Sequence, residues 1–119
     1  DHMHYVLARA AHKRSAYNEA IASAEQVSAK SPLYGNARYL YAIALYGAKK
    51  NRAAQNVLTD LRKWMSANGK SDRNLEALIT VNLARMMFVE KRYQLAQEEY
   101  RRVPKDHPLW VPGLVEQGW

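Results

Sequence analysis

Apolar residues recur along the chain at intervals of three and four, the spacing that places side chains on one face of an α-helix. The first such stretch predicts a helix from His4 to His12. A second helix follows Ser15 as its N-cap and ends before Pro32, because proline cannot continue the hydrogen-bonded backbone of a helix. A third helix opens at residues 35–36 and ends near residues 49–51.

The second half of the chain continues this pattern after one long polar interruption at residues 67–74. A fourth helix precedes the interruption and is expected to end with Gly69 as its C-terminal cap. Ser71 or Asp72 is suited to cap a fifth helix, and a sixth extends to Val103. Helix, short turn and helix, repeated three times, predicts an all-α array of antiparallel hairpins.

A short motif occurs twice in the chain with the same offset to a proline. Residues 16–21, with the sequence AYNEAI, are followed by Pro32, and residues 92–96, with the sequence RYQLA, are followed by Pro108. In both copies the proline comes twelve positions after the alanine that follows the tyrosine, Ala20 in the first and Ala96 in the second. A repeat of fixed period predicts a stacked solenoid, because one unit alone cannot bury its apolar face.

These residues resemble the tetratricopeptide repeat, a family of helical hairpins of about 34 residues with small and large residues at fixed places. The matching positions are Leu7, Ala8, Ala20, Val27 and Pro32, then Tyr41, Ala42, Leu45, Ala54, Leu58 and Leu61, then Asn82, Leu83, Ala84, Met87, Tyr93, Ala96, Tyr100, Val103 and Pro108. In the second unit Ser66 replaces the closing proline and Asn51 the aromatic residue, so the fourth helix is expected to run longer than its counterparts.

The resemblance implies a right-handed α-α superhelix of about three hairpin repeats plus a truncated seventh helix. The expected bounds are 4–34, 35–68 and 77–110 for the three repeats, 69–76 for an insertion, and 111–119 for the start of a further repeat. Ala8 and Ala20 are expected to let the helices of a hairpin approach closely, while Tyr17 and Leu7 fill the wedge beside them.

Composition narrows the class of protein further. The chain has 18 Lys and Arg against 11 Asp and Glu, a net charge of +7, which suits an acidic partner or a solvated helical surface. It has no cysteine, so disulfides and thiolate metal sites are excluded. No stretch approaches the roughly 18 apolar residues of a membrane span, so no membrane insertion is expected.

In tetratricopeptide arrays the first helix of each hairpin lines a concave groove that accepts a peptide or a partner helix. Projected onto this chain, the groove residues are Tyr5, Arg9, His12, Tyr39, Ile43, Tyr46, Val81, Arg85 and Phe88. This aromatic and basic set suits a partner segment that offers apolar and acidic groups. For Tyr39 and Phe88 the alternative is packing between repeats. Recognition of a terminal carboxylate is disfavoured, since among the corresponding places only Arg9 and Asn82 suit it.

The sequence offers little support for metal binding, catalysis or specific nucleic-acid binding. No His pair has the spacing of a helical zinc site, and no phosphate loop or nucleophile motif is present, so no cofactor, metal or catalytic residue is expected. Nucleic-acid binding needs Lys and Arg gathered along one groove with aromatic residues between them. The basic pairs lie near helix ends instead, which disfavours specific nucleic-acid binding and favours a protein-binding scaffold, with homo-oligomerisation as the alternative.

Both ends of the sequence suggest a fragment of a larger protein. Residues 1–3 resemble a cloning remnant. A seventh helix beginning near Pro112 would leave Leu114, Val115 and Trp119 without a covering helix, so self-association through this end is expected. The segment from Trp110 onward is similar to that of bacterial envelope-associated repeat proteins, which favours a bacterial origin and the cell envelope over the cytoplasm.

Overall fold

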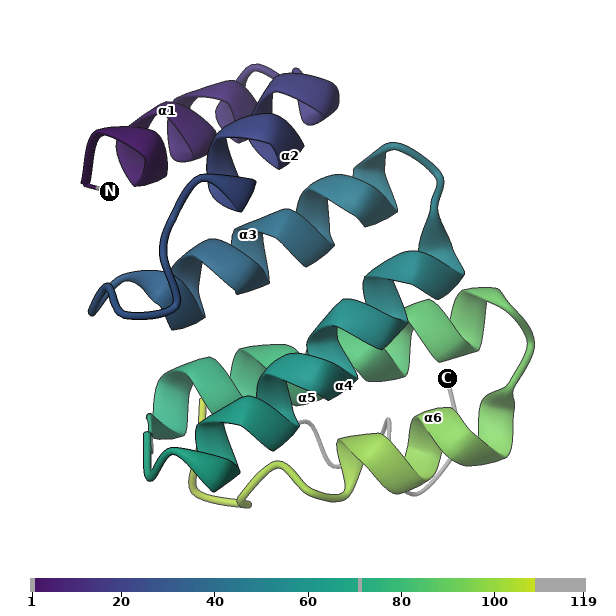
Figure 1. The fold of residues 1–119 in the computed structure, drawn as a ribbon. Coiled ribbons are helices and arrows are strands. Elements are labelled where there is room, and N and C mark those ends of the chain that lie inside the picture. The colour runs from purple at the N-terminus through teal and green to yellow at the C-terminus, as the bar shows by residue number, and fades with distance from the viewer. Residues whose placement is uncertain (1, 71, 109–119) are drawn as a thin grey trace. The chain divides into compact units, whose positions relative to one another are not determined.

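The computed structural model describes residues 2–70 and 72–108, and these residues form α-helices without any strand. The helices are α1 (His2–Lys13), α2 (Tyr17–Glu25), α3 (Tyr34–Gly47), α4 (Asn51–Ala67), α5 (Arg73–Val89) and α6 (Tyr93–Tyr100) (Figure 1). They divide into two compact units, residues 1–70 with α1 to α4 and residues 71–119 with α5 and α6. The all-helical prediction is confirmed.

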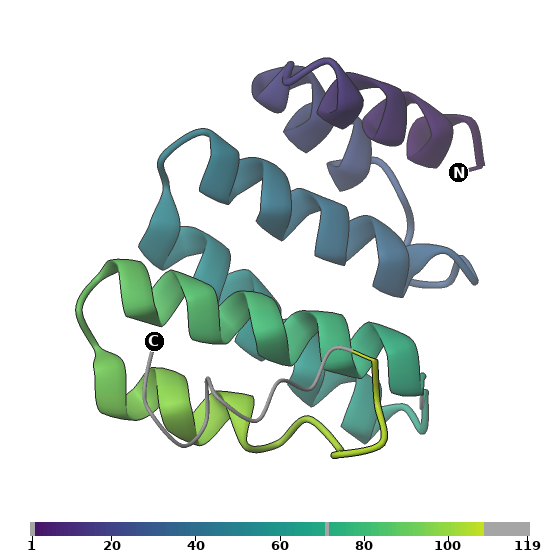
Figure 2. The same cartoon turned by 180° about the vertical axis from the view of Figure 1, so that it is seen from behind.

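Consecutive helices pair as hairpins. In the first unit α1 packs on α2 and α3 on α4, and the two hairpins stack because α2 and α1 also pack against α3. Figures 1 and 2 show α3 between the α1–α2 hairpin and α4. In the second unit α5 packs on α6. Each hairpin buries the apolar stripe that the sequence pattern predicts.

The same backbone turn joins the helices of all three hairpins. Ser15, Lys49 and Lys91 have positive φ angles of 59°, 66° and 63°, and they lie 34 and then 42 residues apart. At the first turn the Ser15 N–H donates to the His12 carbonyl and the Ala16 N–H to the Ala11 carbonyl, and the other two turns repeat this pattern. These bonds satisfy the last carbonyls of the first helix of each hairpin.

The predicted N-cap at Ser15 is wrong. The N-cap of α2 is Ala16, which makes no side-chain capping bond, because Ser15 is used for the left-handed turn that ends α1. The predicted caps at the other interruption are confirmed. Gly69 has a φ angle of +62° after α4, and the Asp72 side chain accepts a hydrogen bond of 3.0 Å from the Leu75 N–H at the start of α5.

Helix lengths follow the sequence signals with one exception. The fourth helix has 17 residues against 9 for α2 and 8 for α6, so the expectation that it runs longer is confirmed. The sixth helix ends at Tyr100 and not at Val103. Val103 is nevertheless buried, so an apolar residue that continues the helical spacing contributes to the core from the turn that follows.

Alanines form the close contacts of the first unit. Ala11, Ala20 and Ala44, from three different helices, make one buried cluster, with Tyr17 packed against it. A Cβ atom added to Gly47 would lie 2.5 Å from the Tyr17 ring, so the ring lies directly on the α3 backbone. The expected wedge is therefore correct for Tyr17. It is wrong for Leu7, which is 50% exposed, because no helix of the first unit covers its side chain.

The second unit is closed by contacts between the start of α5 and the segment after α6. The Arg73 guanidinium pairs with the Asp106 carboxylate at 2.6 Å, and this hydrogen bond and charge lower the pKa of Asp106. His107 is buried, with Nε2 3.1 Å from the Asn74 side-chain oxygen. These bonds hold the chain that follows α6 against the first turn of α5.

Three expectations concern residues outside the described part of the chain. These are the seventh helix at 111–119, the self-association through Leu114, Val115 and Trp119, and the envelope location suggested by the segment from Trp110. Within the described part, none of the helices has the length and apolar character needed to cross a membrane.

Candidate functional site

Six of the nine predicted groove residues belong to the first unit. Tyr5, Arg9 and His12 lie on α1 and Tyr39, Ile43 and Tyr46 on α3. In each helix the three residues are spaced by four and three, so they share one side of the helix. Because α1 contacts α3, the two sets lie on neighbouring helices. We call these six residues the candidate face. Its basic member, the Arg9 guanidinium, lies 5.8 Å from the centre of the Tyr5 ring.

Two of the predicted groove residues take part in hairpin packing. The His12 ring lies edge-on to Tyr17 with centroids 6.1 Å apart, across the turn from α1 to α2. In the second unit Phe88 meets Tyr93 in the same way at 5.0 Å. Both pairs are five residues apart and span the same kind of turn. His12 and Phe88 are half-buried for this reason, and part of each ring stabilises its own hairpin.

Tyr46 occupies the same place in the second hairpin without such a packing role. Five residues later the chain has Asn51, whose side-chain oxygen accepts a hydrogen bond of 2.8 Å from the Gln55 amide. The asparagine therefore bonds within α4, and Tyr46 is 37% exposed. Tyr46 is the aromatic residue of the candidate face with the most surface to offer a partner.

The remaining three predicted residues lie on α5 in the second unit. Val81 is buried, with 5% of its surface exposed, so it belongs to the core and has little side-chain surface for a ligand. Arg85 is exposed and Phe88 half-buried. For this helix, therefore, the structure leaves Arg85 and part of Phe88 accessible.

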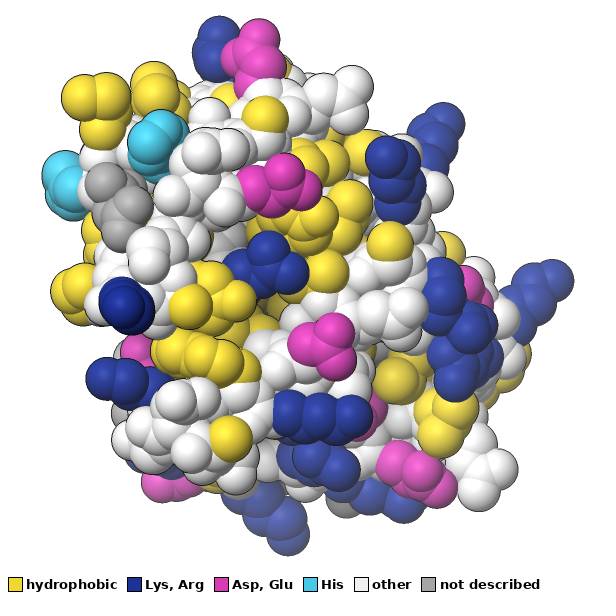
Figure 3. Space-filling view, in the orientation of Figure 1, with side chains coloured by type: hydrophobic (Ala, Val, Ile, Leu, Met, Phe, Trp, Pro, Cys, Tyr) yellow, Lys and Arg dark blue, Asp and Glu magenta, His cyan; other side chains and the backbone are white. Residues whose placement is uncertain are grey.

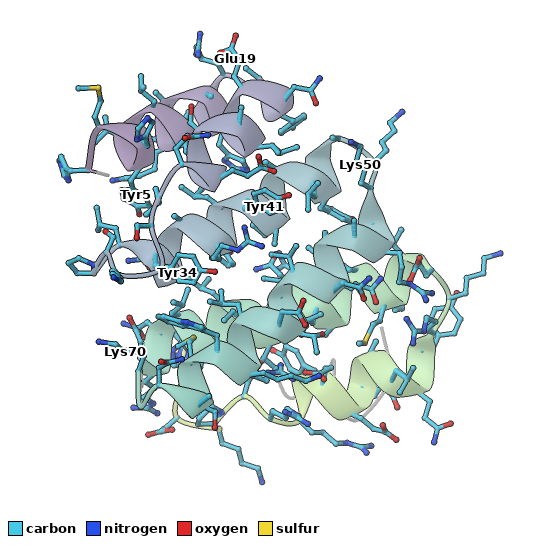
Figure 4. The ribbon with its side chains drawn as sticks, in the orientation of Figure 1. Tyr5, Glu19, Tyr34, Tyr41, Lys50 and Lys70 are labelled. Carbon is cyan, nitrogen blue, oxygen red and sulfur yellow. The ribbon has the colours of Figure 1, made fainter. Side chains whose placement is uncertain are left out.

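The opposite side of α3 holds a cluster that the sequence prediction missed. Tyr34 meets the Trp64 ring of α4 edge-on at 4.8 Å. The Tyr41 hydroxyl donates a hydrogen bond of 2.8 Å to the Glu25 carboxylate of α2, and the Arg38 guanidinium lies 4.3 Å from the Tyr41 ring centre. Figure 4 shows Tyr34 and Tyr41 on this side of α3, and Figure 3 shows hydrophobic surface there between α2 and α4.

This cluster also perturbs an ionisable group. The hydrogen bond to Glu25, with burial and the negative charge of that carboxylate, raises the pKa of Tyr41 above its ordinary value of 10.0. Arg38 acts in the opposite direction but is weaker. The spacing of Tyr34, Arg38 and Tyr41 by four and three was a signal available in the sequence. No signal in the sequence indicated that Glu25 of α2 and Trp64 of α4 lie beside these residues.

Charge is divided unequally between the units. Residues 1–70 contain 11 Lys and Arg against 4 Asp and Glu, while residues 71–119 contain 7 of each. The whole net charge of +7 therefore belongs to the first unit, which also carries the candidate face and the pair of Tyr34 and Trp64. Across the described residues, no three His, Asp or Glu side chains gather closely enough to hold a metal ion.

Comparison with known proteins agrees with this geometry. The family model for the tetratricopeptide repeat matches residues 11–68, about half of the chain, from the end of α1 through α4. Through this segment the chain belongs to the tetratricopeptide repeat family. No curated protein and no solved structure matches the chain.

Membership of this family identifies the general kind of molecule. Tetratricopeptide repeats are in general interaction modules without catalytic activity, and their usual partners are other proteins. For the first unit, family membership therefore indicates in general terms a protein-interaction scaffold.

Proposed function

We propose that this tetratricopeptide protein binds a peptide or helix of another protein on the candidate face of α1 and α3. The observation that carries the proposal is the exposure of Tyr46, since Asn51 removes the ring that would otherwise pack beside it. Tyrosine and arginine are the residue types that most often dominate interfaces, and Tyr5, Arg9 and Tyr39 accompany Tyr46.

The net charge of the first unit supports a partner with acidic as well as apolar groups. Arg9 is exposed, and its described contact is with an aromatic ring. A carboxylate of the partner would complete its hydrogen bonding, while apolar side chains would cover the rings of Tyr39 and Tyr46. On α5, Arg85 offers a further cation in the second unit.

We further propose that the three hairpins are repeat units with the bounds expected from the sequence. The recurrence of the left-handed turn at Ser15, Lys49 and Lys91 supports this, because each lies at the same point of its hairpin. The spacing grows from 34 to 42 residues across the segment 69–76, as an insertion there requires.

A peptide selection tests the binding proposal. Phage-displayed peptides are selected on the chain, and a recovered peptide is titrated calorimetrically against the wild type and Tyr46→Ala. We expect at least a tenfold loss of affinity, since truncating a central aromatic anchor costs roughly 1.4 kcal/mol or more. Leu95→Ala, which changes an exposed residue of α6 in the other unit, is the control and should bind normally. Equal binding to wild type and Tyr46→Ala would contradict the proposal.

A further inference from the structure

One side of α1 presents apolar residues to solvent. Met3, Val6 and Leu7 are 69%, 47% and 50% exposed, and Ala10 is exposed as well. Their spacing of three, four and seven places them on one stripe of the helix. The buried Ala8 lies on the other side of α1, and the buried Ala11 borders the stripe. We call this stripe the open face of α1. Exposed apolar stripes of this kind mark interaction sites more often than scattered single residues do.

The next hairpin shows what covers the equivalent face. The residues 34 positions later are Ala37, Leu40, Tyr41 and Ala44 on α3, and Ala37 and Ala44 have no exposed surface. Ala44 packs with alanines of α1 and α2, and Tyr41 bonds to Glu25 of α2. On α3, therefore, this face is the docking surface for neighbouring helices. On α1 the same face has room for a helix.

Two residues at the open face select a different occupant from the one that covers α3. Gly47 of α3 receives the Tyr17 ring against its backbone, but the equivalent residue of α1 is the exposed Lys13. A tyrosine there would meet the lysine side chain, whereas a carboxylate would pair with it. The residue of α1 equivalent to Tyr41 is Leu7. Tyr41 donates a hydrogen bond to Glu25, but Leu7 has no polar group and therefore favours an apolar neighbour.

The charges of α1 point in the same direction. The helix contains Arg9 and Lys13 and no acidic residue. A second copy of the chain stacking through α6 would bring the exposed Arg101, the counterpart of Glu25, toward this basic helix. Charge complementarity therefore favours a partner with acidic residues over a second copy.

We propose that the open face of α1 docks an amphipathic helix of a partner protein. The apolar stripe of that helix covers Val6, Leu7 and Ala10, and an Asp or Glu at its flank pairs with Lys13. This surface is separate from the candidate face, so it gives the first unit a second binding site that does not depend on Tyr46.

Two synthetic helices of opposite flank charge test the proposal. One peptide has leucines at a spacing of three and four flanked by glutamates, and the other has the same leucines flanked by lysines. We expect saturable binding of the glutamate peptide by fluorescence polarisation at physiological salt, and at least tenfold weaker binding of the lysine peptide. Leu7→Ser should weaken binding of the glutamate peptide at least tenfold. Lys13→Gln should reduce the ratio by which the glutamate peptide binds more tightly than the lysine peptide.

Controls separate this site from the candidate face and from fold damage. Leu95→Ser on α6 should bind the glutamate peptide as the wild type does. The titrations are repeated in a Tyr46→Ala background, where binding at the candidate face does not contribute, and the loss caused by Leu7→Ser should persist there. The circular dichroism melting of Leu7→Ser should match the wild type because the residue is half exposed. The proposal is overturned if neither peptide binds, if both bind equally, or if Leu7→Ser binds normally. Concentration-dependent dimerisation in sedimentation that Leu7→Ser abolishes would assign the face to a second copy and also overturn it.

Discussion

Tyr17 and Gly47 show how much can depend on one pair of residues. Tyr17 is the tyrosine of the first copy of the recurring sequence motif. A Cβ atom built on residue 47 would lie only 2.5 to 2.7 Å from three atoms of its ring. Glycine is otherwise a poor helix residue, costing about 1 kcal/mol relative to alanine. At the end of α3 this cost is offset by the close approach of α2 to the helix backbone.

This contact predicts that the effect of Gly47→Ala depends on residue 17. In the wild type we expect a loss of about 1 kcal/mol in the free energy of unfolding, because displacing a packed ring outweighs the gain in helix propensity. In a Tyr17→Ala background the same change should stabilise by up to about 1 kcal/mol. Urea unfolding of the four proteins measures both effects. The same sign in both backgrounds would show that the ring does not restrict residue 47.

At the scale of the elements, the hairpin turns are the most regular feature of the molecule. Each first helix ends with a residue in the left-handed conformation, although none of the three is glycine. This conformation costs an L-residue roughly 1–2 kcal/mol, and Asn or Gly is the usual choice. The turns are retained because they direct the second helix back along the first, so the packing of each hairpin compensates for local strain.

Adjacent lysines at the second turn provide a matched test. Lys49 has a φ angle of 66°, whereas Lys50 has a φ angle of −105°, which any residue adopts. Lys49→Gly should raise the free energy of unfolding by about 0.5 kcal/mol, since relief of strain exceeds the entropy that glycine adds to the unfolded chain. Lys50→Gly relieves no strain, and because glycine is accepted at the N-cap of α4 it should lower the free energy of unfolding only by up to about 0.5 kcal/mol, through the entropy of the unfolded chain. Chemical unfolding compares the two. If Lys49→Gly is the more destabilising variant, the turn is not strained.

At the scale of the whole molecule, the dominant feature is the separation of charge. The first unit carries the net charge of +7 and the second unit has equal numbers of basic and acidic residues. Basic side chains in the first unit are spread over α1, α3, α4 and the connecting turns, such as Arg9, Lys49 and Arg62, while α2 has none. A distributed field of this kind attracts polyanions without specifying a sequence.

This distribution predicts how the protein responds to nucleic acid. An oligonucleotide should bind at low salt through the first unit and lose affinity by orders of magnitude on approach to about 0.15 M salt. Lys49→Gln with Lys50→Gln should weaken the low-salt complex more than Lys91→Gln with Lys105→Gln, since the second unit has no excess positive charge. Polarisation of a labelled oligonucleotide measures this. A tight, saturable complex at physiological salt would contradict the protein-binding function.

Local signals in the sequence determined most of the secondary structure. Periodic apolar residues predict each helix, and Gly69 and Asp72 act as the predicted caps. Ala20 lies in the buried cluster of alanines from three helices, and Ala8 is buried. These features depend on residues a few positions apart, or on a repeat that recurs within the chain. The six candidate-face residues could likewise be placed on α1 and α3 from helical spacing alone.

Tertiary structure decided which of those side chains remain available. Leu7 and Tyr41 occupy equivalent positions 34 residues apart. Leu7 is half exposed and Tyr41 is bonded to α2, because α2 packs against that face of α3 while no helix of the first unit covers the equivalent face of α1. His12 packs on the ring across its turn, while Tyr46 lacks one. Periodicity assigns a residue to a side of its helix, but exposure depends on which neighbouring helix, if any, packs against that side.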